Sequence, residues 1–471
     1  MFVPKLKFNA RGIIDSGIDY THDDFRTPDG KSRILYIWDQ TDTSNKFPPH
    51  GFIYGSEYDN AQLNKALNSE FPFDIVPPMD FIGHGTAVAG IAAGNGRASR
   101  GQVKGVAPEA SIIVVKLGQA NYFARTTEIS RAVKYLYDKA QELNMPLVLN
   151  LSFGTNNGSH DGNSLFESYI GSMAQKWKSV FVVASGNEGA AGHHFAGRIR
   201  QGETIEIEFS VSGGIKEMYI TLWKNFVDTF TVQLIAPNGQ RSGIISAASP
   251  VNHMNIERTA SILIMYGQPT HYNKSQEIFF SFESVGLGRY IPAGIWRIII
   301  QGVQVTDGRF NIWLPTSEDV TSTTAFLRPS IFTTLTIPST VPNVITVGGY
   351  NSIIETIADF SGRGNTRNDV YLKPDIVAPS VNVASTKRYG GYDTFTGTSM
   401  AAPFVTGAAA LMMEWGIVKN NDPFLYGQRI KAFLHKGAQR EERNSYPNPS
   451  WGYGILCLKN TMDYLIQYPI F

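Results

Sequence analysis

A stretch of small residues late in the chain constrains the fold most. Residues 397–409 read GTSMAAPFVTGAA, and Ser399 lies near the start of this segment. Such a segment is typical of a helix that packs closely against its neighbours, because small side chains let two backbones approach. A serine at the N-terminus of this helix would lie at the positive end of the helix dipole, where packing holds a nucleophile in place.

A serine hydroxyl needs a base to take its proton and a carboxylate to orient that base, and the sequence offers a candidate for each. Asp15 ends a short apolar strand in GIIDSGID (12–19), which places it at the carboxyl end of the strand, where open α/β sheets bind ligands. His84 opens a second run of small residues, GHGTAVAGIAAG (83–94), so we expect a helix that starts at this histidine. Taken singly, the first segment also fits a plain turn and the second a plain helix start.

The chain order of Asp15, His84 and Ser399 is the order found in subtilisin. The segments around these residues resemble the three signature blocks of the subtilisin-like serine proteases, peptidase family S8. The resemblance implies a serine endopeptidase in which Ser399 attacks the scissile carbonyl, His84 accepts the serine proton and Asp15 orients the imidazole. The expected partner is a protein or peptide substrate, cleaved through an acyl-enzyme.

Two further blocks resemble the same family. ASGNEG (184–189) is similar to the block that carries the family's oxyanion-hole asparagine, so Asn187 is expected to stabilise the oxyanion with the backbone N–H of Ser399. Alone, an asparagine beside glycine also fits a left-handed turn. LNLSFG (149–154) is similar to the strand along which these enzymes pair the substrate backbone. The substrate-binding residues that it implies are Ser152, Phe153 and Gly154.

Periodicity outside these blocks predicts an α/β fold. Four short, mostly apolar runs are typical of parallel strands that are buried on both faces. They cover residues 111–117, 145–151, 180–184 and 344–347. A helical pattern at 126–144 forms a crossover between the first two runs, and another covers 423–438. We therefore predict a subtilisin-like parallel sheet with helices on both faces.

The pattern changes between residues 192 and 335, where helical signals vanish and alternating stretches such as ETIEIEFSV (203–211) are separated by Gly, Pro and Asn turns. We predict an inserted, jelly-roll-like β-sandwich at 192–335, which divides the catalytic domain into residues 1–191 and 336–471. The insert should lie beside the catalytic cleft. It resembles the Csp branch of the family, known from spore-forming bacteria, whose members process a cortex-hydrolase zymogen during germination.

Composition argues against several partner classes. The chain has 41 Lys and Arg against 40 Asp and Glu, a net charge of +1, with no run of five like charges, so nucleic acid and anionic membranes are not expected partners. No apolar run approaches the ~18 residues of a membrane span. Cys457 is the single cysteine, which excludes an internal disulfide, and its apolar neighbours predict a buried thiol.

No cofactor and no bound metal are expected. Asp24 falls where the family's strong calcium site takes a carboxylate, yet the loop NGRASRGQVKG (95–105) lacks the expected ligand pattern, so we interpret Asp24 as a solvated surface residue. His160, His193 and His194 are expected to be loop histidines, since nothing in their spacing indicates a zinc site.

The first nine residues, MFVPKLKFN, lack the apolar core of a secretory signal. Only 14 residues precede Asp15, fewer than in the family's mature domains. We expect either a processed or truncated form or a propeptide supplied separately, which assists folding. Localisation stays open, with a spore-associated and an extracellular protein as the options.

Two other classes of function stay open. A pseudoprotease would keep the fold and use the insert as a binding or regulatory module, as in Csp members that have lost triad residues, although this chain has all three. A carbohydrate-binding adhesin built on the sandwich would leave the outer blocks without a purpose. The natural substrate is not encoded in any motif; we expect Phe153 and the loop 155–162 to border the pocket for the residue before the scissile bond.

Overall fold

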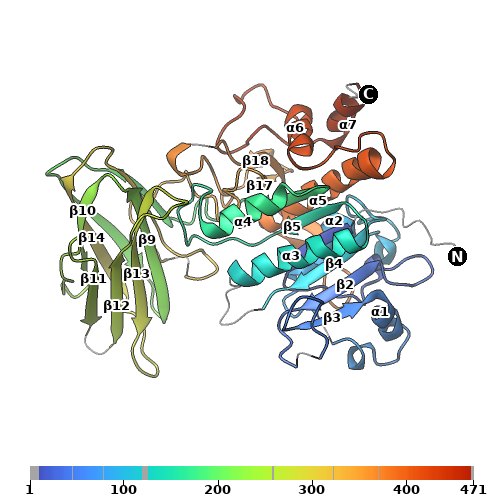
Figure 1. The fold of residues 1–471 in the computed structure, drawn as a ribbon, viewed down its shortest axis with the longest axis horizontal. Helices are drawn as coiled ribbons and strands as arrows, with labels where there is room; N and C mark the ends of the chain where they lie inside the picture. Colours follow the sequence, from blue (N-terminus) through green and yellow to red (C-terminus); the bar gives the residue numbers. More distant parts are fainter. Residues whose placement is uncertain are drawn as a thin grey trace.

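The computed structural model describes residues 10–44, 46–77, 79–118, 126–256, 259–321, 323–369 and 371–467. The described chain forms an α/β lobe and, at one end of the longest axis, a lobe of β-strands (Figure 1). The first nine residues, on which the expectation about a secretory signal rests, lie outside the described part.

A mixed sheet, mostly parallel, forms the centre of the α/β lobe. Its described strands are β1 (Ala10–Asp15), β2 (Ile34–Asp39), β3 (Ser56–Asp59), β4 (Ser111–Lys116), β5 (Leu147–Leu151), β6 (Ser179–Ala184), β17 (Ile345–Asn351), β18 (Thr356–Ile357) and β19 (Ile376–Pro379). Their order is β18-β17-β6-β5-β1-β4-β2-β3, with β19 also paired to β17. The pairs from β17 to β2 are parallel, and β17–β18 and β2–β3 are antiparallel. Strands β4, β5 and β6 are buried at every position, which explains their continuous apolar sequence.

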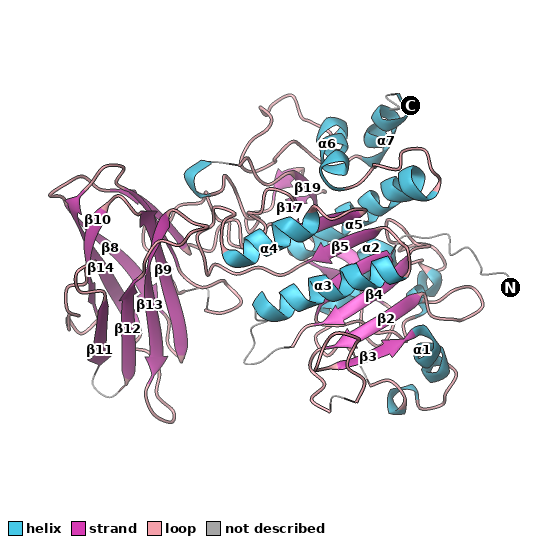
Figure 2. Ribbon diagram, viewed as in Figure 1, coloured by secondary structure: helices cyan, strands magenta, loops and turns pink. Residues whose placement is uncertain are grey.

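Helices cover both faces of this sheet (Figure 2). They are α1 (Asn60–Leu67), α2 (His84–Ala93), α3 (Thr126–Glu142), α4 (Leu165–Ala174), α5 (Thr398–Met413), α6 (Gly427–Gly437) and α7 (Leu458–Gln467). One apolar cluster joins α3 and α4 to one face. A second cluster joins α1 and α2 to the opposite face. A third cluster joins α5, α6 and α7 to that same face. The predicted sheet with helices on both faces is confirmed.

Helix α5 runs through the core. Together with the π-helical turn Glu414–Val418 it forms, among the described residues, the single helix that is long and apolar enough to cross a membrane by length and composition. Of its most apolar window, 67% is buried inside the protein. The helix packs against α2, β6 and β17, as the core helix of a folded lobe does.

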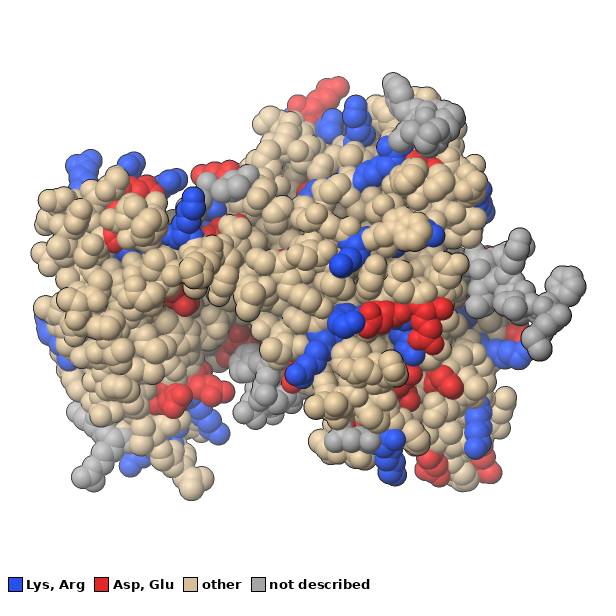
Figure 3. Space-filling view, in the orientation of Figure 1, with Lys and Arg blue, Asp and Glu red and all other residues tan. Residues whose placement is uncertain are grey.

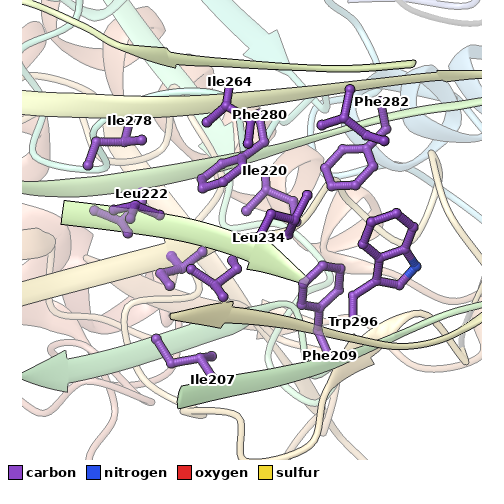
Figure 4. Packing of buried hydrophobic residues seen from close by; sticks show 14 of the residues in the cluster. Ile207, Phe209, Ile220, Leu222, Leu234, Ile264, Ile278, Phe280, Phe282 and Trp296 are labelled. Atoms are coloured by element: carbon purple, nitrogen blue, oxygen red, sulfur yellow. The ribbon is translucent and has the colours of Figure 1, made fainter. Parts of the chain in front are cut away.

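The second lobe is the predicted β-sandwich. Its described strands are β7 (His194–Arg198), β8 (Thr204–Val211), β9 (Glu217–Asn225), β10 (Thr229–Ile235), β11 (Val251–Ile256), β12 (Ala260–Tyr266), β13 (Ser275–Ser284), β14 (Gly294–Gln304), β15 (Arg309–Trp313) and β16 (Ala325–Phe326). They form two antiparallel sheets, β10-β14-β8-β16 and β11-β12-β13-β9-β15-β7. Large side chains of both sheets, such as Phe209, Phe280 and Trp296, share one apolar core (Figure 4). The jelly-roll connectivity and the domain limits stay predictions.

Two expectations about single residues are wrong. Asp24 is buried, with 1% of its surface exposed, and its carboxylate accepts hydrogen bonds from the backbone N–H groups of Gly96 and Ala98 and from the hydroxyl of Tyr392. Protein donors therefore occupy the oxygens that a solvated aspartate would offer to water. Cys457 is only partly buried.

Charged side chains of both signs are interspersed on the face of the molecule in Figure 3, with no extended area of one sign there. This distribution matches the net charge of +1. Among the described residues, no group of three or more His, Cys, Asp or Glu side chains is arranged to hold a metal ion.

Candidate active site

Asp15 and His84 meet at the carboxyl edge of the sheet. Asp15 is the last residue of β1, His84 is the first residue of α2, and Nδ1 of His84 lies 2.6 Å from Oδ1 of Asp15. The backbone N–H of Ser16 donates to the same oxygen at 2.7 Å. The side chain of Asp15 is 3% exposed, against 34% for His84. A buried carboxylate therefore orients an imidazole that still reaches the surface of the cleft.

The electrostatic surroundings of His84 favour its charged form. Burial of the ring opposes the positive charge, but the adjacent carboxylate of Asp15 outweighs this effect. Glu318 and Asp80 add to it at longer range, and together these groups raise the pKa of His84 to about 9. The imidazole is therefore protonated at neutral pH in the free protein, and it must lose that proton before it can act as a general base.

Asp80 fixes the start of α2. Its Oδ1 accepts from the backbone N–H of Gly83 at 2.7 Å and from the hydroxyl of Ser16 at 2.9 Å. Its Oδ2 accepts from the backbone and the hydroxyl of Thr86 at 2.9 and 2.6 Å. These bonds hold the residues on both sides of His84. None of the sequence blocks singles out Asp80, and the capping rule does not find it, because it lies three residues before Gly83, the N-cap of α2.

Ser399 is the second residue of α5 and lies in one pocket with Asn187. The preceding Gly397 has φ 145° and ψ 159°, a conformation that favours glycine. Oδ1 of Asn187 accepts from the backbone N–H of Thr398 at 2.9 Å and from its hydroxyl at 3.0 Å. The amide NH₂ group is then the part of Asn187 that is left to donate into the pocket.

Hydrogen bonds tie α5 to the end of β5. The buried side chain of Asn150 donates to the hydroxyl of Ser152 at 2.9 Å and accepts from the hydroxyl of Thr406 at 2.9 Å. The hydroxyl of Ser152 donates in turn to the carbonyl oxygen of Ser399 at 3.2 Å. The segment expected to bind substrate is thus fixed against the helix of the expected nucleophile.

A pocket of about 110 Å³ opens beside Ser399. The three residues expected to bind substrate line it, namely Ser152, Phe153 and Gly154. Within the described part of the chain, Phe153 and Gly154 make no hydrogen bond between main-chain atoms, so their backbone is available to an added strand. The loop 155–162 does not line this pocket, contrary to expectation. It holds the sandwich instead, as Nδ2 of Asn156 donates to the carbonyl oxygen of Leu314 at 3.0 Å.

The three histidines expected in loops are buried between the two lobes. The ring of Trp313 stacks on His160 and on His194, with centroids 4.0 and 4.8 Å apart. Burial lowers the pKa of His160 to about 3 and that of His194 to about 4, so both rings stay neutral. His194 begins strand β7, and His193 contacts a carboxylate oxygen of Glu188 through Nδ1 at 2.5 Å. These histidines join the insert to the α/β lobe.

Comparison with known proteins places the chain in a family. A family model described as the subtilase family matches residues 12–244 and 328–454. The chain belongs to the subtilase family. The resemblance to subtilisin-like serine proteases drawn from the sequence blocks is therefore confirmed.

Individual subtilases are similar over most of this chain. It is 41% identical to the CspB protease of Clostridium perfringens and matches its solved structure with a TM-score of 0.88, over 98% of this chain and 95% of that one. This likeness confirms the resemblance to the Csp branch.

The PI-type proteinase of Lactococcus lactis subsp. cremoris is 25% identical over 89% of this chain and 23% of its own length. The minor extracellular protease Vpr of Bacillus subtilis (strain 168) is 24% identical, over 97% of this chain and 52% of its own. The chain thus spans from about a quarter to about half of these curated relatives.

Proposed function

We propose that this chain is a serine endopeptidase that hydrolyses peptide bonds of a protein substrate with Asp15, His84 and Ser399. The observation that carries the proposal is the 2.6 Å contact between Nδ1 of His84 and buried Asp15. Glu318, which lines the pocket that holds Ser399, lies within electrostatic reach of both residues. Membership of a family of serine proteases supports the same assignment. No feature of the described site favours a pseudoprotease over this function.

In this proposal each group has a role. The hydroxyl of Ser399 attacks the scissile carbonyl while neutral His84 takes its proton, and His84 later gives that proton to the leaving amine. Asp15 holds the imidazole through Nδ1 and stabilises the imidazolium. The acyl-enzyme is then hydrolysed by water, which His84 activates in the same way.

The negative charge of the tetrahedral intermediate needs donors that are already in place. The NH₂ group of Asn187 is one donor, because Thr398 holds the other end of the same amide. The backbone N–H of Ser399 is the second, since the first N–H groups of a helix have no partner within the helix. Both residues line the same pocket, which supports this assignment.

The proposal extends to the substrate and the domains. The peptide lies along Ser152, Phe153 and Gly154 as an added strand, with its scissile bond at Ser399. The Csp resemblance favours a zymogen as the protein that is processed. The catalytic domain comprises residues 1–191 and 336–471, and the sandwich comprises 192–335.

A fluorophosphonate probe tests the proposal directly, because it reacts rapidly only with a serine that is activated by a base. We expect the probe to label Ser399, located by peptide mass spectrometry, and the Ser399→Ala variant to be folded, unlabelled and inactive on a protein substrate. The Ser168→Ala variant, which alters an exposed serine on α4, should label like the parent protein. A folded parent protein that is neither labelled nor able to cleave a peptide library would identify a pseudoprotease.

A further inference from the structure

The insert supplies one wall of the pocket beside Ser399. Two walls come from the α/β lobe, through residues 152–154 and through Gly186, Asn187 and Glu188. The insert contributes Thr316, Ser317 and Glu318, which lie shortly after the end of β15 in the sandwich. The sequence predicted that the insert lies beside the cleft, but it did not single out these three residues as lining the pocket.

This wall is held in place by a buried carboxylate. Oε1 of Glu188 accepts from the backbone N–H of Ser317 at 3.0 Å, and its Oε2 contacts Nδ1 of His193 at 2.5 Å. Glu188 is 4% exposed, so both of its oxygens are used inside the protein. Asp319 braces the same segment, because Oδ2 accepts from the backbone N–H of Thr316 at 3.3 Å. The wall is therefore fixed rather than a loose loop.

Glu318 is the carboxylate of this wall that has no partner. Its side chain is exposed and makes no hydrogen bond or ion pair with another described residue. The surrounding protein atoms remove part of the water around the carboxyl group, which raises the pKa of Glu318, and the positive charge of His84 opposes that rise. Asp15 also acts on it, so Glu318 lies within electrostatic reach of the catalytic pair. An exposed carboxylate without a partner among the described residues thus lines the pocket that holds Ser399.

We propose that Glu318 is a specificity-determining residue that selects substrates with lysine or arginine immediately before the scissile bond. The inference rests on the proposed peptidase function and names the substrate class of that site. A basic side chain in the pocket places its apolar stem along Phe153 and its charge at Glu318. An acidic side chain meets repulsion from Glu318 and from buried Glu188, and a neutral one gains no ion pair.

The experiment uses a set of peptides that differ only at the residue before the scissile bond, which is Arg, Lys, Gln or Glu. The full chain is compared with Glu318→Gln, with Glu318→Lys and with a matched control, Glu283→Gln, an exposed carboxylate on β13 of the insert outside the pocket. Each protein is also titrated with the fluorophosphonate probe, which reports the reactive serine independently of the peptide.

We expect the parent protein and Glu283→Gln to cleave Arg and Lys peptides about tenfold better in kcat/KM than the Gln peptide, because the pair forms where substrate excludes water. Glu318→Gln should abolish this preference, and Glu318→Lys should favour the Glu peptide. The parent protein should also lose part of the preference at high salt, which needs no variant.

Two results overturn the inference in distinguishable ways. If Ser399 is labelled but the parent protein shows no preference for basic peptides, the assignment of Glu318 fails and the peptidase function stands. The same conclusion follows if Ser399 is labelled and the Glu318→Gln variant keeps the preference. If neither labelling nor cleavage occurs in the parent protein, both fail together. If both Glu318 variants are unfolded, the parent protein decides alone. A preference of the parent protein for Arg and Lys peptides that does not weaken at high salt overturns the proposed ion pair.

Discussion

The helices that carry the active site and the sandwich beside them are packed in opposite ways. In α2 and α5, glycine and alanine let backbones meet: a Cβ atom on Gly85 would collide with the carbonyl oxygen of Gly17, and one on Gly407 would lie 2.5 Å from Cβ of Val106. The sandwich core is filled instead by bulky side chains such as Phe280 and Trp296 (Figure 4).

Close backbone packing and bulky side-chain packing serve two different purposes, the placement of polar atoms and the stability of the fold. Close backbone packing brings the first turns of α2 and α5 to the sheet edge, where polar atoms must be placed to within a few tenths of an ångström. Bulky apolar side chains give the sandwich its stability through buried area, about 25 cal/mol for each Å². Mutations in the two regions should therefore differ in whether they affect stability or chemistry.

The largest effect on stability is expected in the sandwich. Phe280 is 0% exposed, so Phe280→Ala should lower the free energy of unfolding by about 3–5 kcal/mol, measured by urea denaturation. Phe279→Ala, on the other face of the same strand, is the matched control and should cost clearly less, because Phe279 is only partly buried. The folded fraction of both variants should still label at Ser399. Equal losses of stability would contradict the assignment of the sandwich core.

The sequence predicts most of the α/β lobe, because its signals are local or periodic. The apolar runs became β4, β5, β6 and β17, and the small-residue segments became α2 and α5. The residues of the site were also found at the expected ends of strands and helices, since each block carries its own turn or helix start. The helix predicted at 423–438 begins later, at Gly427, because propensity alone does not fix a helix end.

What the sequence did not predict depends on contacts between distant segments. Thr316, Ser317 and Glu318 have no periodic pattern, and only the docking of the sandwich brings them to a pocket that is otherwise formed by residues of the α/β lobe. The burial of Asp24 likewise depends on Tyr392, which is far away in the chain. Such contacts follow from the tertiary fold, which no local motif encodes.

The largest effect on chemistry short of removing the nucleophile is expected at Asn187. Asn187→Ala should lower kcat by about 10² to 10³, with KM and stability nearly unchanged, because the lost donor acts on charge that develops in the transition state. Thr398→Val is a graded control, since the backbone N–H of Thr398 still holds Oδ1. It should lower kcat less than Asn187→Ala. A large rise in KM with kcat retained would assign Asn187 to substrate binding instead.

An intermediate effect on both the stability and the labelling rate of Ser399 is expected where an added methyl group overfills the close packing of α5. In Gly407→Ala the added methyl group would meet Val106 inside the core, so we expect a loss of about 1–3 kcal/mol in the free energy of unfolding. Because α5 would also move away from α2, the labelling rate of Ser399 should fall. Gly171→Ala in α4, where the nearest atom is a movable methyl group of Val341, should change labelling little. Unchanged labelling in Gly407→Ala would show that the site does not depend on this contact.

The smallest effect concerns the pH at which the site becomes active. Because the pKa of His84 is raised to about 9, kcat/KM should rise with pH up to about pH 9, as the neutral base becomes the main form. The groups that favour the charged ring are Asp15, Glu318 and Asp80. Removing one negative charge in Glu318→Gln disfavours the imidazolium, so the profile should move toward lower pH, whereas Glu283→Gln should leave it in place.

This pH test uses a substrate with a neutral residue before the scissile bond, so that the selectivity assigned to Glu318 does not enter. Because kcat/KM reports the free enzyme, its profile follows His84 before substrate displaces water from the cleft. A profile that levels off near pH 7 would mean that water screens the neighbouring carboxylates from the ring. A profile that rises to about pH 9 and shifts in Glu318→Gln would place a charge from the sandwich lobe within reach of the catalytic base, so that the insert acts on chemistry as well as on stability.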